Sequence, residues 1–183
     1  MSENIHPFHN VLSLPTCLPL EVRRIEAVDE IQWQRLLYRN TLLLEIVLQS
    51  QSQPVREGEE GRENQDIRRL DVKLDFLMSL MGQTQNPAVI TAGNIHISEN
   101  GLSYTQPTKL LPRQLLHLRL FISPRYQHPL ELAATVCSCV QRSDQYEVTA
   151  VFLPLPEDLK ELLAKLIFQM HRHHVAKTRK NKK

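Results

Sequence analysis

Residues 94–102, Asn-Ile-His-Ile-Ser-Glu-Asn-Gly-Leu, constrain the fold of this chain more than any other stretch. Apolar and polar residues alternate through Ile95 and Ile97 and again from Leu102, as in strands that bury one face. The Asn-Gly pair between them is typical of a tight hairpin, because both residues accept a positive φ at little cost. We therefore expect a β-hairpin with Ser98 at a strand end and its hydroxyl near the free N–H groups of the turn.

Short apolar segments separated by turn residues fill most of the second half of the chain. Regular spacing of such segments predicts a small barrel or sandwich. Prolines and the Ser143-Asp144 pair supply the turns. The expected strands are Val89–Ala92, Asn94–Ser98, Leu102–Tyr104, Leu115–Ile122, Leu130–Gln141 and Tyr146–Leu153.

Two helical patterns precede this β region. From about Leu20 to Gln51 the chain has no Gly or Pro, and its composition favours helix. A second helix is expected from about Glu63 to Met81, with apolar residues at spacings of three and four, which is the seam of a short coiled coil. A single amphipathic helix that packs on its own domain is the alternative. The helices carry more apolar surface than one small barrel buries, so we expect oligomerisation through them, as a dimer or tetramer. The expected interface residues are Ile67, Leu70, Leu74, Leu77, Met81, Leu36, Leu43 and Val47.

A closing helix is expected at about Pro156–His173. Pro156 suits a first helical position, and the two acids that follow it complement the positive end of the helix dipole. Its leucines form an apolar stripe that can cover one end of the barrel. His171, His173 and His174 near its end lack a nearby carboxylate or cysteine that would complete a metal site, so we expect no metal.

The chain therefore divides into four parts. These are an extended lead-in at 1–19, a helical hairpin for oligomerisation at 20–82, a β-barrel with its closing helix at 83–173, and a basic tail at 174–183. The expected class is α+β, a small antiparallel β-barrel between an N-terminal helical hairpin and a C-terminal helix.

Composition narrows the function. The chain is 42% hydrophobic and 23% charged, as in ordinary globular proteins, and has only three cysteines, so we expect a cytoplasmic protein without a disulfide framework. No apolar run is long enough to span a bilayer. Nucleophile, metal-protease and phosphate-loop motifs are absent, and five glycines leave little scope for a phosphate-cradling loop. We expect no enzymatic activity and no cofactor.

Charge is unevenly distributed along the chain. Residues 171–183 hold six Lys and Arg and no acid, so removing these six from 22 leaves 16 basic residues against 20 acids. A basic tail can contact nucleic acid or a membrane surface, or it can be a solvated terminus. The acidic body and the few aromatics interleaved with basic residues argue against nucleic acid as a partner.

The order of helix, barrel and closing helix, together with the Ile-Ser-x-x-Gly-Leu turn at residues 97–102, resembles the PilZ domain family. The resemblance spans about residues 67–172. The late strand at 148–153 followed by Pro-Glu-Asp at 156–158 is also similar to that family. The stretch at 71–75 looks like the helix before the barrel in an atypical branch, whose added heptad-bearing helices can form tetramers.

This resemblance implies a ligand, cyclic di-GMP. In the family, an Arg-x-x-x-Arg segment before the first strand pairs with phosphates and stacks on guanine, and an Asp/Asn-x-Ser-x-x-Gly turn contacts the guanine edge. Ser98 and Gly101 match the turn, whereas His96 stands where the family has Asp or Asn. No arginine lies between Arg69 and Arg113, so the first strand of the expected barrel has no arginine pair before it. The candidate ligand-binding residues are Arg68, Arg69, His96, Ser98, Asn100 and Gly101.

Two functions are consistent with these departures. The first is a self-assembling adaptor of cyclic di-GMP signalling that binds the nucleotide weakly or not at all and acts on an unknown protein partner, with motility, pilus function or biofilm formation as implied outputs. The second is a genuine cyclic di-GMP receptor with an altered site.

Overall fold

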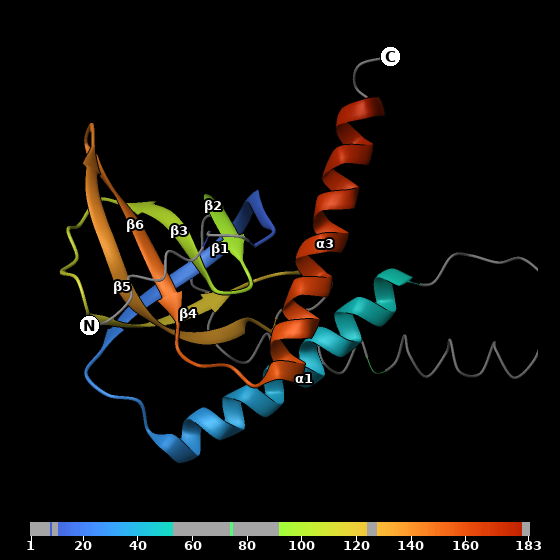
Figure 1. Ribbon diagram of the computed structural model, residues 1–183, viewed down its shortest axis with the longest axis horizontal. Coiled ribbons are helices and arrows are strands. Elements are labelled where there is room, and N and C mark those ends of the chain that lie inside the picture. Colours follow the sequence, from blue (N-terminus) through green and yellow to red (C-terminus); the bar gives the residue numbers. More distant parts are fainter. Residues whose placement is uncertain (1–7, 9–10, 53–73, 75–91, 124–127, 181–183) are drawn as a thin grey trace, which may run out of the picture.

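Six antiparallel strands close into a barrel in the order β1-β2-β3-β6-β5-β4, with α1 and α3 beside it (Figure 1). The computed structural model describes residues 8, 11–52, 74, 92–123 and 128–180. Its elements are β1 Ser13–Ile25, α1 Glu30–Ser52, β2 Ala92–Ser98, β3 Gly101–Gln106, β4 Leu115–Leu120, β5 Leu130–Arg142, β6 Gln145–Phe152 and α3 Glu157–Lys180. The expected α+β class with a small antiparallel barrel and a closing C-terminal helix is confirmed.

The first strand was not expected from the sequence. β1 runs over Ser13–Ile25, a region that we expected to be an extended lead-in followed by helix, and this expectation was wrong. β1 pairs with β2 as far as Pro19, and from Leu20 it pairs with β4 instead. A proline costs a ladder hydrogen bond inside a strand. Pro19 lies where the strand changes partner, and there its carbonyl accepts a hydrogen bond from the Phe121 N–H.

α1 begins ten residues later than expected. The Asp29 carboxylate accepts a hydrogen bond from the Gln32 N–H at 2.8 Å, which is the geometry of an N-cap. Capping therefore fixes the start of the helix at Glu30. The second helix expected at 63–81 lies outside the described residues, apart from Leu74, which is helical and exposed. None of the described helices has a run of apolar residues long enough to cross a bilayer.

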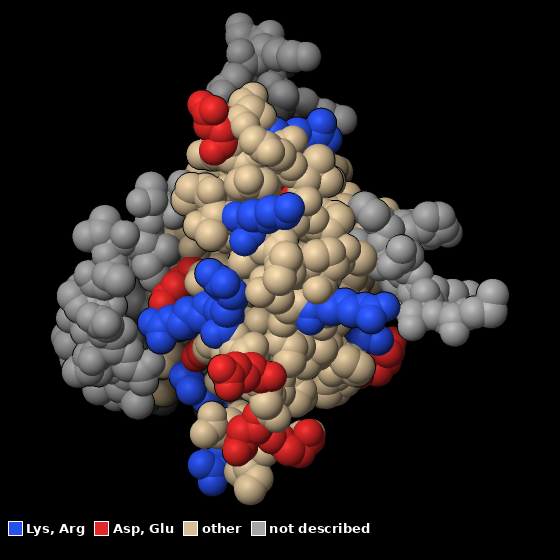
Figure 2. All heavy atoms as spheres, turned by 90° about the vertical axis from the view of Figure 1, so that its left-hand side faces the viewer, with Lys and Arg blue, Asp and Glu red and all other residues tan. Residues whose placement is uncertain are grey.

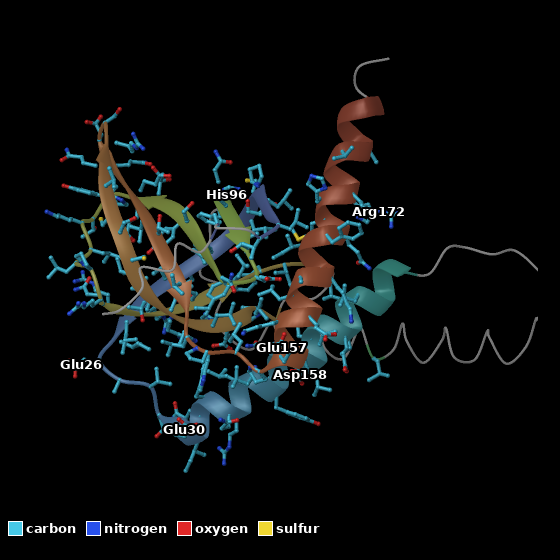
Figure 3. The ribbon with its side chains drawn as sticks, in the orientation of Figure 1. Glu26, Glu30, His96, Glu157, Asp158 and Arg172 are labelled. Carbon is cyan, nitrogen blue, oxygen red and sulfur yellow. The ribbon has the colours of Figure 1, made fainter. Side chains whose placement is uncertain are left out.

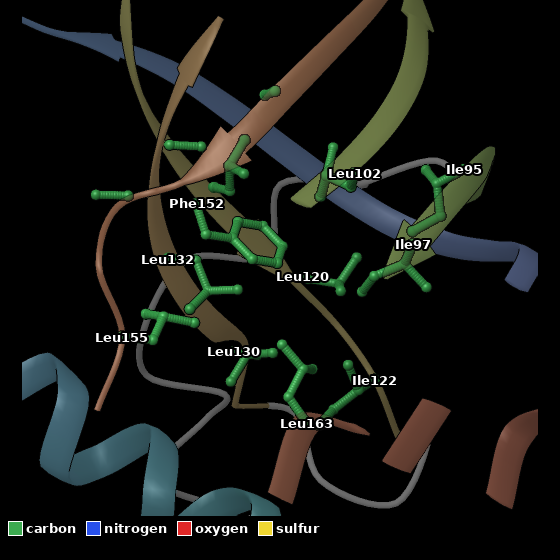
Figure 4. Packing of buried hydrophobic residues seen from close by; sticks show 14 of the residues in the cluster. Ile95, Ile97, Leu102, Leu120, Ile122, Leu130, Leu132, Phe152, Leu155 and Leu163 are labelled. Atoms are coloured by element: carbon green, nitrogen blue, oxygen red, sulfur yellow. The ribbon is translucent and has the colours of Figure 1, made fainter. Parts of the chain in front are cut away.

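Strand alternation fills the barrel with branched side chains (Figure 4). Ile97 and Leu102 are opposite one another in the β2–β3 register, and both are buried. α3 covers one end of the barrel, where its fully buried Leu163 lies near Leu130 and Ile122. The same helix packs against α1, and α1 packs on β5.

A buried amide joins α1 to the barrel. The start of β5 extends past the end of β6, because the β5–β6 register begins only at Ala134. The Asn40 side chain, 2% exposed, satisfies that free edge. Its Nδ2 donates to the Glu131 carbonyl at 2.6 Å, and its Oδ1 accepts from the Glu131 N–H at 3.0 Å. A side-chain amide thus takes the position of a neighbouring strand's peptide group.

Candidate functional site

The β2–β3 turn is built around the Ser98 side chain. The Ser98 hydroxyl donates to the Gly101 carbonyl at 3.2 Å and accepts from the Asn100 N–H at 3.3 Å. Ser98 has no exposed surface. The expected hairpin, with the Ser98 hydroxyl at the free N–H groups of its turn, is confirmed. The observed role of Ser98 is to hold the turn.

The backbone reason that we expected for this turn was wrong. In the described chain, only Arg113 and Ser143 among the non-glycine residues have a positive φ, and no glycine has one. Because Ile97 is opposite Leu102, Glu99 and Asn100 are the central residues of the turn, and the Asn-Gly pair lies across its end. Neither Asn100 nor Gly101 therefore needs the left-handed region.

His96 lies on the outward face of β2, because it alternates with the buried Ile95 and Ile97 (Figure 3). The Phe8 ring stacks on the imidazole, with ring centroids 4.6 Å apart and an interplanar angle of 24°. In the matching family turn this position holds an acidic or amide side chain that faces the ligand. Here an aromatic side chain of the same chain covers the position.

The structure changes which segment precedes the first strand and could carry the arginine pair. With β1 as the first strand, the segment directly before the barrel is residues 1–12, and these contain no Lys or Arg. Arg68 and Arg69 follow α1 in the chain, so they do not precede the first strand, and both lie outside the described residues. The described structure therefore brings together His96, Ser98, Asn100 and Gly101, whereas Arg68 and Arg69 lie outside the described residues.

The residues expected at a subunit interface separate into two groups. Leu43 and Val47 are buried in the core of their own chain, and Leu36 packs partly against it. Ile67, Leu70, Leu77 and Met81 lie outside the described residues, whereas Leu74 is exposed. The exposed apolar residues of α1 are Ile31, Tyr38 and Leu42, which the expectation missed. Their spacings of seven and four place them on one stripe of the helix.

Charged side chains form a connected group between β1, β4 and β5. Arg119 Nη1 lies 2.5 Å from Glu21 Oε2, and His117 Nε2 lies 3.0 Å from Glu131 Oε2. Burial raises the pKa of Glu131, but the nearby His117, Arg119 and Arg39 side chains outweigh burial, so the net shift is downward. Burial opposes the Arg23 and Arg119 hydrogen bonds at Glu21 in the same way, and the pKa of Glu21 is also lowered. These pairs stabilise the fold.

No group of three or more potential metal-ligating side chains occurs in the described part of the chain. A cleft of about 570 Å³ opens where β1 ends beside the start of β4, and Arg24, Glu26 and Arg113 are among its lining residues. These residues are far apart in sequence, and the Ile25–Leu115 register brings them together. No motif in the sequence marks them.

One solved structure agrees with this architecture over nearly the whole chain. A solved structure from Xanthomonas campestris, described as a tetrameric PilZ domain self-assembled through a helical bundle, is similar over 94% of this chain and 95% of its own, with a TM-score of 0.77 and 23% identity. A second structure, the Bacillus subtilis inhibitor of motility, gives a TM-score of 0.38 and 12% identity over 45% of this chain and 42% of its own. No curated protein matches the chain.

The family profile described as "Atypical PilZ domain, cyclic di-GMP receptor" matches residues 43–180, which is well over half of the sequence. The matched range includes the Ser98 turn, β2 to β6 and α3, and it begins after β1. The chain belongs to the atypical PilZ domain family.

Proposed function

We propose that this protein is a self-assembling regulator of cyclic di-GMP signalling that binds the nucleotide weakly or not at all and acts as an adaptor in the cytoplasm. The observation that carries the proposal is the state of the β2–β3 turn. Ser98 uses its hydroxyl within the turn, and Phe8 covers His96. The two side chains best placed to contact a guanine edge are therefore already engaged by their own chain.

The absence of an Arg-x-x-x-Arg segment before β1 also supports weak or absent nucleotide binding. Cyclic di-GMP carries two phosphates, and arginine binds phosphate through paired, charge-assisted hydrogen bonds. A hydrogen bond to a charged group contributes about 1.5–3 kcal/mol, so loss of two such contacts weakens binding by about 10²–10⁴-fold. Residues 1–12 contain no Lys or Arg that could replace these contacts.

Self-assembly has its own support. Ile31 and Tyr38 are each 67% exposed, and with Leu42 they form one apolar stripe on α1 that the described residues leave exposed. Exposed apolar patches of this kind mark interaction surfaces. The structurally similar Xanthomonas protein is described as a tetramer assembled through a helical bundle. We propose that the α1 stripe contributes to a comparable association, together with Leu74 and the seam residues Ile67, Leu70, Leu77 and Met81.

Isothermal titration calorimetry with cyclic di-GMP at low salt tests the ligand part. We expect no saturable heat up to several hundred micromolar nucleotide, a concentration scale that follows from the weakening estimated above. Micromolar binding that weakens in Asn100→Ala would overturn the adaptor proposal and favour a receptor with an altered site. Asn100 is half-buried at the turn, so this variant changes the candidate site without removing the Ser98 hydroxyl.

Sedimentation velocity tests the assembly part. The double variant Ile31→Glu, Tyr38→Glu should shift the sedimenting species toward the monomer, because it places two charges on the stripe. Leu12→Glu is the matched control, since Leu12 is an exposed apolar residue outside the helices. An unchanged mass in the double variant would exclude α1 from the interface.

A further inference from the structure

The end of the barrel away from α3 carries two arginines, Arg24 and Arg113, that are unpaired among the described residues. Figure 2 faces this end and shows Lys and Arg side chains around uncharged surface, with Asp and Glu side chains among them, mostly in the lower half of the view. Arg24 and Arg113 line the cleft of about 570 Å³, and both are exposed. Neither guanidinium forms an ion pair or hydrogen bond with any residue that the structure describes. By contrast, the chain without its last 13 residues has more acids than bases.

The loop that holds Arg113 is fixed by its backbone. Arg113 has a φ of 69°, which lies in the left-handed region that residues other than glycine rarely adopt. The Arg113 N–H donates to the Val136 carbonyl at 2.9 Å, and the Val136 N–H donates to the Gln114 carbonyl at 2.9 Å. The Gln114 Oε1 also accepts from the Leu111 N–H at 2.9 Å. The Arg113 backbone is therefore set before anything binds, which lowers the ordering cost of recognition.

Exposed apolar side chains lie on the loop that holds Arg113 and on the part of β5 beside it. Leu111, two residues before Arg113, is 61% exposed, and Val140 is 48% exposed. The Leu110 N–H contacts Cys139 Sγ at 3.4 Å, which places this loop beside the part of β5 that carries Val140. We call Arg24, Leu111, Arg113 and Val140 the barrel-end surface. Two exposed guanidinium groups, with exposed apolar side chains on the Arg113 loop and on the strand beside it, complement an acidic, partly apolar segment.

We propose that the barrel-end surface docks an acidic peptide segment of a partner protein, with carboxylates on Arg24 and Arg113 and an apolar side chain against Leu111. This inference rests on the proposed function, because an adaptor needs a surface for its partner. A free phosphate would leave Leu111 and Val140 unused and would meet the Glu26 carboxylate in the same cleft. An extended peptide can place its carboxylates apart from Glu26.

Fluorescence anisotropy on the full chain tests the proposal. The probe is a fluorescein-labelled hexapeptide, Glu-Asp-Leu-Leu-Asp-Glu, and the comparison probe is its uncharged counterpart, Gln-Asn-Leu-Leu-Asn-Gln. We expect saturable binding of the acidic probe at least about tenfold tighter than the uncharged one, weakening as salt rises. Equal binding of the two probes, or no binding of either, would overturn the proposal.

Variants locate the contact. Arg24→Ala and Arg113→Ala should each weaken binding of the acidic probe about fivefold, and Leu111→Ser about threefold. Glu26→Gln should tighten it about twofold, a gain that misfolding cannot produce. Arg172→Ala is the control of equal charge, because Arg172 lies on α3, on the opposite side of the molecule from Glu26 (Figure 3). An unchanged affinity in both arginine variants would exclude this surface.

Competition with inorganic phosphate tests whether the cleft binds phosphate and not a peptide. Complete displacement of the probe at low millimolar phosphate, with no effect of Leu111→Ser, would assign the cleft to a phosphate ligand and overturn the peptide proposal. Calorimetry with cyclic di-GMP on the same samples is an independent readout. Tight nucleotide binding would refute the adaptor function whether or not the peptide binds.

Discussion

Arg119 and Arg113 are two arginines of the same barrel that differ in burial and in their partners. The Arg119 side chain is 15% exposed and contacts Glu21 and Glu131, whereas Arg113 is exposed and its guanidinium has no partner in the described chain. The Arg119 region belongs to the packing between β1, β4 and β5. The Arg113 region carries a strained backbone with free charge. The difference separates charges that stabilise the fold from charges that remain available for binding.

The largest loss of stability is expected at Asn40, through which α1 contacts the start of β5. Asn40→Leu leaves the Glu131 N–H and carbonyl without hydrogen bonds in a buried site, and this should lower the free energy of unfolding by about 3 kcal/mol. Asn40→Asp should cost less, because a carboxylate can still accept from the Glu131 N–H. Urea denaturation measures both. Equal stability of Asn40→Leu and the parent would mean that α1 does not protect the β5 edge.

A smaller effect is expected from the Glu131 charge. Glu131→Gln should lower stability near neutral pH by about 1–2 kcal/mol, discounted for partial exposure. Because the folded pKa of Glu131 lies below its ordinary value of 4.5, the carboxylate's contribution is present above that pH and is lost as pH falls through the folded value. The stability difference between parent and variant should therefore shrink below about pH 4.5.

His128 contributes a separate pH dependence. Burial and the nearby Arg39 and Arg119 charges outweigh Glu131 and lower the pKa of His128, so stability decreases as pH falls through its ordinary value of 6.5. Parent and Glu131→Gln share His128, so most of this loss cancels in their difference. A difference that stays constant from pH 6 to pH 3 would contradict the role given to Glu131.

A substitution at Arg113 should raise the free energy of unfolding, whereas those at Asn40 and Glu131 should lower it. Arg113→Gly removes left-handed strain and should raise stability by about 0.5–1 kcal/mol, while binding of the acidic probe falls about fivefold. Ser143→Gly is the matched control, because Ser143 has a φ of 52° in the β5–β6 turn. It should give a similar gain in melting temperature without the loss of binding. A stability loss in Arg113→Gly would show that the side chain supports the fold.

The smallest change in stability is expected for Arg24, which we compare with Arg119. Arg24→Ala should change the free energy of unfolding by less than about 0.5 kcal/mol, since no described residue pairs with it. Arg119→Ala, at a paired position on the neighbouring strand, should cost more than 1 kcal/mol because it leaves Glu21 and Glu131 under-compensated. Similar losses in the two variants, measured by urea denaturation, would remove the distinction between the regions.

The sequence predicted the parts of the fold whose signals are local. Alternation and turn residues located β2 to β6 within a few residues, and Pro156 marked the start of α3. The sequence could not predict β1, because Pro15 and Pro19 normally argue against a strand and only the exchange of partners at Pro19 makes room for it. A local signal at the α1 start, Asp29 with Gln32 three residues later, was present and was overlooked.

The candidate site was predictable only in part. The Ser98 turn is contiguous in sequence, so its hydrogen bonds could be anticipated from Ser98 and Gly101. The stacking of Phe8 on His96 and the meeting of Arg24 with Arg113 depend on which strands become neighbours. Because the first strand was missed, the segment expected to carry arginines was placed after α1 instead of before β1.

The Asn40 amide also bears on aggregation. An open strand edge can recruit another chain's strand and start an ordered aggregate, and proteins usually guard such edges. Here the guard for the start of β5 is a single side chain on α1, the helix that also carries the exposed apolar stripe. Any movement that lifts α1 away from the barrel would therefore uncover the free edge of β5, and in the proposed assembly it would also displace the apolar stripe on the same helix.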